Sequence, residues 1–414
     1  MINIALLGHG IVGSGVVEVL RNNSALIAKK AGAQINLKYI LDIREIQDEE
    51  LAKLHTTNFD EIINDGSVKV VVEVMGGLEP AYSFVKSALL HGKHVVTSNK
   101  EVVEMHGAEL LKIAKDNNVN FLFEASSGGC VPIIRNLKET LISDKITEVK
   151  GILNGSTNYI LTKMTYKNQD FDSALKEAQE KGYAEKNPVE DVEGFDTARK
   201  IAIIFSLITE KKIAYKDIKV EGIKAVTPDD IEFAKMVNGA IKLVADGKIF
   251  DNKIAIEVSP TVFTEKNQFY YINNVNNCVS VKGKFTGELC FSGEGAGQLS
   301  TATAVITDMI DAIKHIDSNI GYYWEKSDIK ITSFEDVEKN YFNVVKLTDV
   351  NKDDAIESIK NIFKDYEIKI VESPNYNDKI AFIIKKIMRN KLNFIINNAK
   401  LNGIKIESTF IFEK

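Results

Sequence analysis

The first strand and turn of the chain decide its fold: residues 2–20 read INIALLGHGIVGSGVVEVL. The apolar run at 2–7 stops at a glycine, which is typical of a buried parallel strand. The turn GHGIVG at 8–13 then matches the pattern G-x-G-x-x-G and opens a predicted helix. Its glycines allow a tight turn, a close approach of the backbone to a pyrophosphate, and packing of helix on strand. We therefore predict dinucleotide binding here, through Gly8, Gly10, Ile11, Val12 and Gly13.

Apolar runs and amphipathic segments alternate through the first third of the chain. We expect strands at 37–42, 68–75, 94–99 and 119–125, and helices at 12–30, 80–91 and 101–117. Strands that alternate with helices indicate βαβ units in a parallel sheet. The fold class is therefore α/β, with a Rossmann-like doubly wound parallel sheet.

The ends of two predicted strands carry further candidate cofactor residues. Asp42 ends the second strand, where a carboxylate would bind a ribose 2′-hydroxyl and favour NAD, while Arg44 could meet the 2′-phosphate of NADP. The choice between NAD and NADP stays open. Thr97, Ser98 and Lys100 follow another strand, at the edge of the sheet where ligands bind. Ser98 or Asn99 could instead cap the next helix.

Two further units are expected beyond the nucleotide domain. Residues 1–135, completed by about 293–318, form the first domain, and 136–292 form an α+β catalytic and dimerisation domain. In the second domain we predict strands at 145–154 and 254–291, and helices at 156–167, 170–182, 194–211 and 228–247. Residues 340–414 show the order β-α-β-β-α-β of a ferredoxin-like fold. A charged stretch at 318–338 is the predicted linker.

Composition and charge exclude several classes of protein. The chain has 414 residues and a net charge of −6, which argues against a basic nucleic-acid binder. The sequence has no apolar run of about 18 residues, so we expect no membrane span. Three cysteines, at 130, 278 and 290, show no CxxC spacing and predict neither a disulfide framework nor a zinc site. We expect a cytoplasmic protein.

Residues 182–200, GYAEKNPVEDVEGFDTARK, hold the strongest candidate for chemistry. Asp196 and Lys200 are four residues apart at the polar start of a predicted helix, so they share one face. A positioned lysine can exchange a proton with a hydroxyl or a carbonyl group. An ordinary surface ion pair is the alternative. Glu185, Asp191 and Glu193 fit either a solvated acidic loop or an anchor for an ammonium group.

Two glycine-rich or polar turns follow predicted strands. The turn from Glu124 to Pro132 exposes carbonyl oxygens that could hold a hard cation with the Glu124 carboxylate. Cys130 in this turn could be a thiol nucleophile, although we favour a small buried residue. Asn154 begins a second turn, where it could cap a helix or contact a ligand.

Together these segments resemble homoserine dehydrogenase. The matching stretches are, in order, 8–13, VVEVMGGLEPA at 71–81, VTSNK at 96–100, FEASSGGCVPII at 123–134, LNGSTNYI at 153–160, 182–200, and GEGAGQLSTATAV at 293–305. They extend over about three quarters of the chain, and the 182–200 segment is the most specific. The resemblance implies interconversion of L-homoserine and L-aspartate 4-semialdehyde with NAD or NADP, in the biosynthesis of threonine, methionine and isoleucine.

The resemblance also implies roles for individual residues. Lys200 would exchange the substrate proton beside Asp196, and Lys100 would lie near both cofactor and substrate. The substrate would contact Glu185, Asp191, Asp196, Tyr183 and Asn154. The cofactor would also contact Gly182, Glu185, Gly295 and Gly297. A sodium ion would be held by Glu124 and the backbone at Ser127, Gly129 and Val131. A homodimer formed through the middle domain is expected.

Two departures from the family pattern bear on these expectations. Ser127 and Cys130 replace an aliphatic residue and a glycine in the ion turn, and Cys130 restricts φ. The C-terminal unit resembles an ACT regulatory domain, but TDVNKD at 348–353 replaces its usual Asp-x-Pro-Gly loop, so threonine feedback does not follow. The alternatives are a phosphorylating semialdehyde dehydrogenase that uses Cys130, and a non-catalytic NAD(P)-binding sensor.

Overall fold

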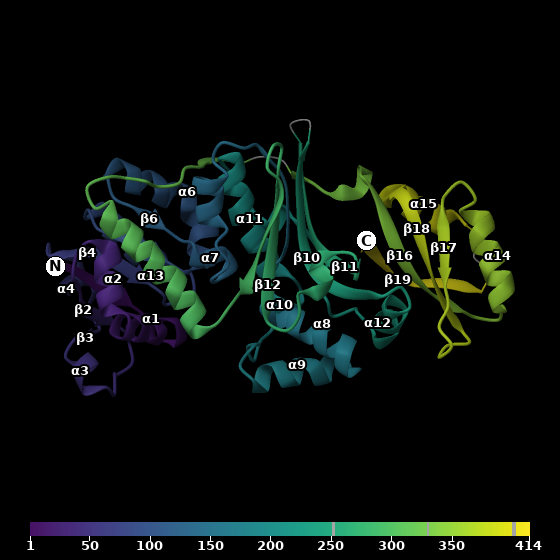
Figure 1. Ribbon diagram of the computed structural model, residues 1–414, viewed down its shortest axis with the longest axis horizontal. Helices are drawn as coiled ribbons and strands as arrows, with labels where there is room; N and C mark the ends of the chain where they lie inside the picture. The colour runs from purple at the N-terminus through teal and green to yellow at the C-terminus, as the bar shows by residue number, and fades with distance from the viewer. Residues whose placement is uncertain (251–252, 329–330, 400–402) are drawn as a thin grey trace. The chain divides into compact units, whose positions relative to one another are not determined.

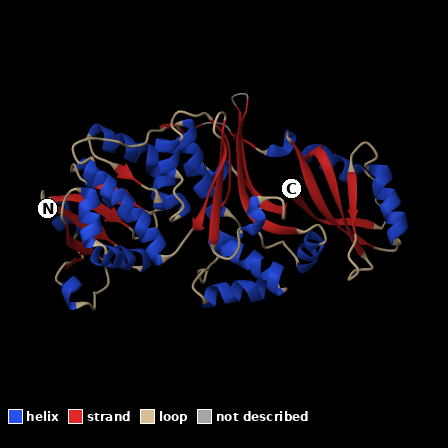
Figure 2. Ribbon diagram, viewed as in Figure 1, coloured by secondary structure: helices blue, strands red, loops and turns tan. Residues whose placement is uncertain are grey.

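Strand β1 (Ile2–Leu7) lies inside a six-stranded sheet with the order β3-β2-β1-β4-β5-β6. The computed structural model describes residues 1–250, 253–328, 331–399 and 403–414 (Figures 1 and 2). All neighbours in this sheet pair in parallel. The other strands are β2 (Ile35–Leu41), β3 (His55–Thr56), β4 (Val68–Glu73), β5 (His94–Thr97) and β6 (Phe121–Leu122). The expected doubly wound parallel sheet is confirmed.

Helices that cover this sheet come from both ends of the first unit's sequence. They are α1 (Ile11–Asn22), α2 (Ser24–Ala31), α3 (Glu49–Ala52), α4 (Phe59–Ile63), α5 (Ala81–Leu90), α6 (Lys100–Asp116), α7 (Ala125–Gly128), a π-helical turn (Asn136–Thr140) and α13 (Gln298–Lys314). Helix α13 packs against α1 so closely that a Cβ at Gly15 would lie 2.7 Å from the carbonyl oxygen of Gln298. The helix after the second glycine turn therefore returns to the nucleotide-binding sheet, as the sequence indicated.

Burial explains why the central strands read as continuous apolar runs. Val70, Val71 and Val72 of β4 are all fully buried, although their side chains alternate between the two faces of the sheet. Helices cover both faces of a doubly wound sheet, so neither face needs polar side chains. The core on one side joins β1 and β4 to α1 and α13.

The middle of the chain forms a mixed sheet with helices. Its strands are β7 (Ile146–Ile152), β10 (Gly239–Phe250), β11 (Lys253–Thr264) and β12 (Asn276–Gly283), with β13 (Gly287–Glu294) following. Its helices are α8 (Gly155–Lys167), α9 (Phe171–Glu180), α10 (Val189–Val192), α11 (Phe195–Thr209) and α12 (Pro228–Lys235), besides short 3₁₀ turns. The helix expected at 228–247 is wrong in its second half. Asn238 turns the chain with φ +53°, and the segment after it forms β10, which is buried over most of its length.

The C-terminal segment confirms the ferredoxin-like order. It comprises β16 (Glu338–Leu347), α14 (Lys352–Ile362), β17 (Ile368–Val371), β18 (Lys379–Met388), α15 (Arg389–Asn398) and β19 (Ile404–Glu413). The strand order is β19-β16-β18-β17, and each pair is antiparallel. Strand β19 also pairs in parallel with β11, so the middle and C-terminal sheets are continuous.

The predicted linker at 318–338 contains short regular elements. These are β14 (Glu325–Asp328), β15 (Ile331–Thr332) and a 3₁₀ turn (Phe334–Asp336), while residues 329–330 lie outside the described residues. Strand β14 pairs with β8 (Lys211–Lys212), and β15 and β9 (Lys219–Val220) pair with β11. Strand pairing therefore gives this segment its regular structure. The local pattern of charges does not predict that pairing.

Contacts divide the chain into two compact units. The first holds Met1–Ile146, Arg199–Tyr215 and Lys282–Ile329, and the second holds Thr147–Ala198, Lys216–Val281 and Lys330–Lys414. The finer division into three domains stays a prediction. Within the described residues, no helix combines the length and the apolar character needed to cross a bilayer.

Candidate functional site

The turn from β1 into α1 has the geometry that its glycines predict. Gly8 has φ +97°, and a Cβ there would lie 2.9 Å from the Cα atom of Met75. A Cβ at Gly13 would lie 2.1 Å from the Gly8 carbonyl oxygen, whereas one at Gly10 would meet only Arg44, at 3.8 Å. Helix α1 therefore starts with uncovered amides, and Ile11 is exposed beside them. Such a terminus attracts phosphate.

A cavity of about 350 Å³ adjoins this turn, and Gly8, Gly10, Asp42, Arg44, Met75 and Phe84 are among its lining residues. The Asp42 carboxylate accepts hydrogen bonds from the His9 amide at 2.7 Å and from the Arg44 amide and guanidinium at 2.9 Å each. The hydrogen bond from the Arg44 side chain is the main reason that the pKa of Asp42 lies well below its usual range. The two residues that favour different cofactors thus form one ion pair.

Glu73 is a buried acid at the end of β4 that the sequence reading did not single out. Its carboxylate accepts hydrogen bonds from the Thr97 hydroxyl at 2.5 Å and from the Met75 amide at 2.8 Å. Burial raises its pKa. Asn99 caps α6 through the amides of Glu101 and Val102. Lys100, which is half-buried, is the first residue of α6, and Ser98 precedes the cap.

Glu124 is held by backbone amides. One carboxylate oxygen accepts from the amides of Ile133 at 2.7 Å and Ile134 at 2.9 Å, and the other accepts from the amide of Arg135 at 2.6 Å. Burial raises the pKa of Glu124. Asp308 of α13, which the sequence reading missed, accepts from the Glu124 amide and from the Arg135 guanidinium, both at 2.8 Å. An acid within an apolar helix was the signal that could have identified it.

The turn after Glu124 meets the second glycine turn. Gly129 has φ +59°, and a Cβ there would lie 2.3 Å from the Gly295 carbonyl oxygen. Gly297, with φ +139°, begins α13. Ser127 is buried, and its hydroxyl has no hydrogen-bond partner among the described residues. The described residues contain no cluster of three or more His, Cys, Asp or Glu side chains suited to a metal, so a cation here would rely on backbone oxygens.

Cys130 differs from expectation in two respects. It is exposed rather than buried in the turn. Its φ is not in the left-handed region, since the positive φ at this turn belongs to Gly129. Replacement of a glycine by Cys130 therefore does not strain the backbone.

The second unit brings together three of the predicted substrate residues. The Asn154 side-chain amide donates to Asp191 at 2.6 Å and to Asp196 at 2.8 Å. Its oxygen accepts from the Thr157 amide at 2.8 Å and so caps α8. Capping and site formation, which the sequence presented as alternatives, are performed by one side chain. Asp196 is only 1% exposed, so the alternative of an ordinary surface ion pair with Lys200 is wrong.

Lys200 follows Asp196 by one turn of α11, and its side chain is half-buried. Helix α11 begins at Phe195 directly after Gly194, whose φ of +85° turns the chain. A Cβ at Gly194 would lie 2.9 Å from the side chain of Val220, so this turn is packed closely against the second unit's sheet. This packing therefore fixes the position at which α11 begins.

Gly182, Tyr183 and Glu185 are exposed, whereas Ala184 between them is buried. Gly182 has φ +74°, and the Tyr183 carbonyl accepts a hydrogen bond from the Ser156 hydroxyl at 2.5 Å. The Tyr183 ring packs against Tyr159, with ring centroids 4.9 Å apart. Glu185 is exposed, and the structure does not bring its side chain to Asn154 or Asp196 by any described hydrogen bond.

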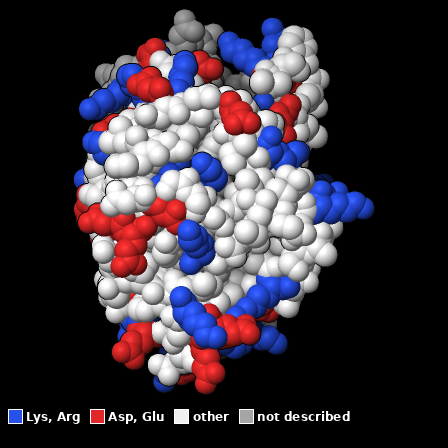
Figure 3. All heavy atoms as spheres, turned by 90° about the vertical axis from the view of Figure 1, so that its left-hand side faces the viewer, with Lys and Arg blue, Asp and Glu red and all other residues white. Residues whose placement is uncertain are grey.

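Charges of both signs are mixed on the one face drawn in Figure 3, where the described residues form no broad basic patch. Lys and Arg side chains are interspersed there with Asp and Glu side chains. Binding of a nucleic acid backbone requires clustered basic side chains.

Two family models match the chain, with descriptions that agree. The model "Homoserine dehydrogenase, NAD binding domain" matches residues 8–124, and "Homoserine dehydrogenase" matches residues 132–310. The homoserine dehydrogenase of Bacillus subtilis is 39% identical over 335 residues, which are 79% of this chain and 77% of that protein.

Two solved structures that are similar to this chain are also homoserine dehydrogenases. A homoserine dehydrogenase from Thiobacillus denitrificans has a TM-score of 0.88 and 31% identity, over 100% of this chain and 98% of that one. A hyperthermophilic archaeal homoserine dehydrogenase mutant in complex with NADPH has a TM-score of 0.64 and 27% identity, over 75% of this chain and 97% of that one.

Proposed function

Because the chain belongs to the homoserine dehydrogenase family, we propose that its own residues perform the parts of that reaction described below. The protein is an NAD(P)-dependent oxidoreductase that interconverts L-homoserine and L-aspartate 4-semialdehyde. The roles of individual residues, the cofactor preference, the ion and the assembly are proposals. The observation that supports them most directly is the hydrogen-bonded group of Asn154, Asp191 and Asp196, one helical turn before Lys200.

Lys200 is the proposed proton acceptor in homoserine oxidation. A bound nicotinamide would supply the acceptor for the hydride of the hydroxyl-bearing carbon. Lys200, as the neutral amine, takes the hydroxyl proton, and as the ammonium it returns that proton in the reverse direction. Asp196 is its partner at the substrate, and the buried hydrogen bond from Asn154 fixes the direction of its carboxylate.

Acidic residues are the proposed site for the substrate ammonium group. Asp191 and Asp196 share the Asn154 amide and so present two carboxylates together. Tyr183 and Glu185 complete the proposed contacts. Because Glu185 is exposed, its carboxylate stays hydrated until the substrate binds.

The cofactor is proposed to bind along the glycine turn of β1–α1. The residues present fit a pyrophosphate, because Gly10 leaves the space open and α1 offers its amides. Lys100 supplies a positive charge near cofactor and substrate. The remaining proposed contacts are Gly8, Ile11, Val12, Gly13, Thr97, Ser98, Gly182, Glu185, Gly295 and Gly297.

We propose that the Asp42–Arg44 pair admits both NAD and NADP. With Arg44 bound to it, Asp42 repels a 2′-phosphate less, and the guanidinium remains 66% exposed for that phosphate. When NAD binds, the Asp42 carboxylate can instead accept a hydrogen bond from the ribose 2′-hydroxyl. The archaeal relative's complex with NADPH agrees with an NADP-competent site.

A sodium ion is proposed at the turn of Glu124, Ser127, Gly129 and Val131. Glu124 and Asp308 place two buried carboxylates beside one guanidinium, and the Ser127 hydroxyl lacks a partner among the described residues. A cation would offset the excess negative charge. Replacement of sodium by choline at constant ionic strength should lower turnover, and unchanged turnover would remove the ion from the proposal.

The assembly and the location of the protein are also proposed. A homodimer through the middle domain follows from the family resemblance, and light scattering that shows a monomer at micromolar concentration would contradict it. A cytoplasmic location is supported by the free cysteines Cys130, Cys278 and Cys290. The C-terminal ferredoxin-like segment is proposed as an ACT-like regulatory domain.

The decisive test measures turnover separately with NAD and with NADP. Purified protein is incubated with L-homoserine and either NAD or NADP at alkaline pH, and formation of the reduced cofactor is followed by absorbance. We expect turnover with at least one cofactor, with no requirement for phosphate. Cofactor binding without turnover would instead support the sensor, and phosphate-dependent turnover of the semialdehyde would support the Cys130 enzyme.

A further inference from the structure

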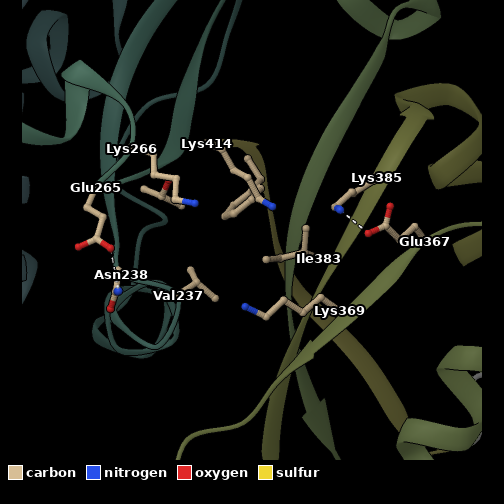
Figure 4. A pocket seen from close by; sticks show the side chains of 11 residues that line it. Val237, Asn238, Glu265, Lys266, Glu367, Lys369, Ile383, Lys385 and Lys414 are labelled. Atoms are coloured by element: carbon tan, nitrogen blue, oxygen red, sulfur yellow. Dashed lines mark hydrogen bonds and ion pairs between the residues drawn. The ribbon is translucent and has the colours of Figure 1, made fainter.

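A second cavity, of about 390 Å³, lies in the second unit between two walls (Figure 4). One wall comes from the turn between α12 and β10 and from the end of β11, and the other comes from β17, β18 and β19. Its apolar surface includes Val237, Ile383 and Phe412. The volume is in the range of small-molecule sites. None of its lining residues belongs to the proposed cofactor or substrate contacts.

Lysine side chains dominate the charge of this cavity: Lys266, Lys369, Lys385 and Lys414. Lys385 is paired with Glu367, whose pKa is lowered chiefly by this hydrogen bond, so that pair is neutral. Glu265 accepts from Asn238 at 3.2 Å and is turned toward it in Figure 4. The cavity is therefore lined by four lysines and only two side-chain carboxylates, Glu265 and Glu367, and keeps an excess of positive charge.

Three of these lysines lie outside ion pairs, although the charge of Lys414 still contributes to the lowered pKa of Glu367. No described acidic side chain forms an ion pair with Lys266, Lys369 or Lys414. Figure 4 shows the amino groups of Lys266 and Lys369 directed into the space between the two walls. Ammonium groups that outnumber the neighbouring carboxylates repel one another, and a bound anion relieves this repulsion.

Thr264 gives an independent indication of a ligand. It lines the cavity and is 7% exposed, and its hydroxyl has no hydrogen-bond partner among the described residues. Buried hydroxyl groups usually have partners, because an unmade hydrogen bond is costly. Thr264 therefore adds an unsatisfied hydroxyl group to the lining of the cavity.

Protection of a sheet edge does not explain this arrangement. Strand β17 is the last strand of its sheet, and lysines on an edge strand prevent pairing with other chains. That accounts for Lys369 on β17. It does not account for Lys266 beyond the end of β11 or Lys414 beyond the end of β19, which meet Lys369 at the same cavity.

We propose that this cavity binds a small anion that carries carboxylate or phosphate groups. The ammonium groups of Lys266, Lys369 and Lys414 bind the charged groups through charge-assisted hydrogen bonds, and the apolar wall takes the carbon skeleton. The site lies where β11 of the middle segment meets the ferredoxin-like segment, because β11 and β19 are paired. The proposal is independent of the dehydrogenase reaction.

Titration calorimetry of the full chain tests the proposal. The protein is saturated with NAD, so that the phosphate position at α1 is occupied, and is titrated separately with inorganic phosphate and with succinate against a sodium chloride blank of equal ionic strength. We expect saturable binding of one anion or both. Saturation by phosphate alone, or by succinate alone, identifies which class the cavity takes.

Matched variants assign the binding to the cavity. Lys266→Gln and Lys369→Gln should each weaken it about tenfold, because each removes one charge-assisted hydrogen bond. Lys364→Gln, an exposed lysine outside the cavity, should leave it unchanged. Homoserine turnover of all three confirms that they fold. The proposal is overturned if neither anion binds saturably, or if the double variant Lys266→Gln/Lys369→Gln binds as tightly as the unsubstituted protein.

Discussion

At the scale of the residue, Asn154 shows how one side chain can satisfy two requirements. Its oxygen caps α8 and its amide group holds Asp191 and Asp196. The sequence placed Asn154 at the start of a helix, where it could cap the helix or contact a ligand. The acids lie 37 and 42 residues further along the chain, and only the fold brings them to the amide.

Asn154→Ser and Asn154→Ala separate these two functions. Serine can keep the cap, so the free energy of unfolding should fall by less than with alanine, which costs about 1 kcal/mol. Both variants lose the hydrogen bonds from the side-chain amide to Asp191 and Asp196, so kcat/KM for homoserine should fall in both. Denaturant unfolding and initial rates measure the two effects. If the serine variant keeps full kcat/KM, Asn154 positions nothing at the site.

Lys200→Ala should lower kcat by about 10²–10⁴-fold, the range for loss of a general acid–base group. Cofactor affinity, measured by fluorescence titration, should change little, because the proposed cofactor contacts lie elsewhere. Lys224→Ala, at an exposed lysine of the second unit, is the control and should keep its activity. Preserved kcat in Lys200→Ala would remove Lys200 from the proposed role.

Cofactor choice should respond in opposite directions to the two members of one ion pair. Arg44→Ala should lower kcat/KM with NADP by about tenfold or more relative to NAD, because it removes a charge-assisted contact to the 2′-phosphate. Asp42→Ala should impair NAD more than NADP, because it removes the ribose acceptor. Arg21→Ala, whose partners are Asp48 and Glu50, should not change the ratio. Equal losses with both cofactors in Arg44→Ala would contradict this view of the pair.

At the scale of the element, the β1–α1 turn distinguishes two uses of glycine. Gly13 is needed for packing, since a Cβ there would lie 2.1 Å from the Gly8 carbonyl oxygen. Gly10 has φ −83° and open space, so alanine fits the protein itself. The sequence pattern presents both positions as equivalent glycines, and the coordinates separate them.

Gly13→Ala should therefore lower the free energy of unfolding by about 1–3 kcal/mol through overpacking, and weaken cofactor binding as well. Gly10→Ala should leave stability within about 0.5 kcal/mol but weaken cofactor binding, because the methyl group occupies the approach to the pyrophosphate. Thermal unfolding with and without NADP checks both. Equal stability of the two variants would contradict the assignment.

At the scale of the whole molecule, buried charges join the C-terminal segment to strands β10 and β11 of the middle segment. Lys339 of β16 contacts Asp246 of β10 at 3.0 Å and Glu257 of β11 at 2.8 Å. Lys150 contacts Glu413 of β19 at 2.6 Å. Burial opposes ionisation of Asp246, but the charges of Lys339 and Lys150 outweigh it and lower its pKa. These ion pairs, with the β11–β19 pairing, hold the segment in a specific place.

Lys339→Met should lower the free energy of unfolding by about 3–5 kcal/mol, because it removes the ion-pair partner of buried Glu257 and leaves buried Asp246 with only Lys150, at 3.8 Å. The Lys219–Glu335 pair is more than 40% exposed, so Lys219→Met should cost no more than about 1 kcal/mol. Urea unfolding at neutral pH gives both values. Because protonation relieves an unpaired buried carboxylate, the deficit of Lys339→Met should shrink as the pH falls. A loss below 1 kcal/mol in Lys339→Met would show that the network contributes little.

The sequence by itself determined the nucleotide-binding sheet, its glycine turn and the ferredoxin-like order at the C-terminus. These rest on periods of two or three to four residues and on turn glycines, which are local properties. It also led to the wrong helix after Lys235, since a strand buried on both faces has no alternation to distinguish it from a buried helix.

Tertiary structure alone decided which polar residues meet. Glu73 with Thr97, Glu124 with Asp308, and Lys339 with Asp246 each join residues from distant elements. The same is true of the lysines around the second cavity. Partners of this kind are selected by the cost of burying an unpaired charge or polar group, which no local pattern records. Local sequence therefore determined the elements, and packing determined the sites.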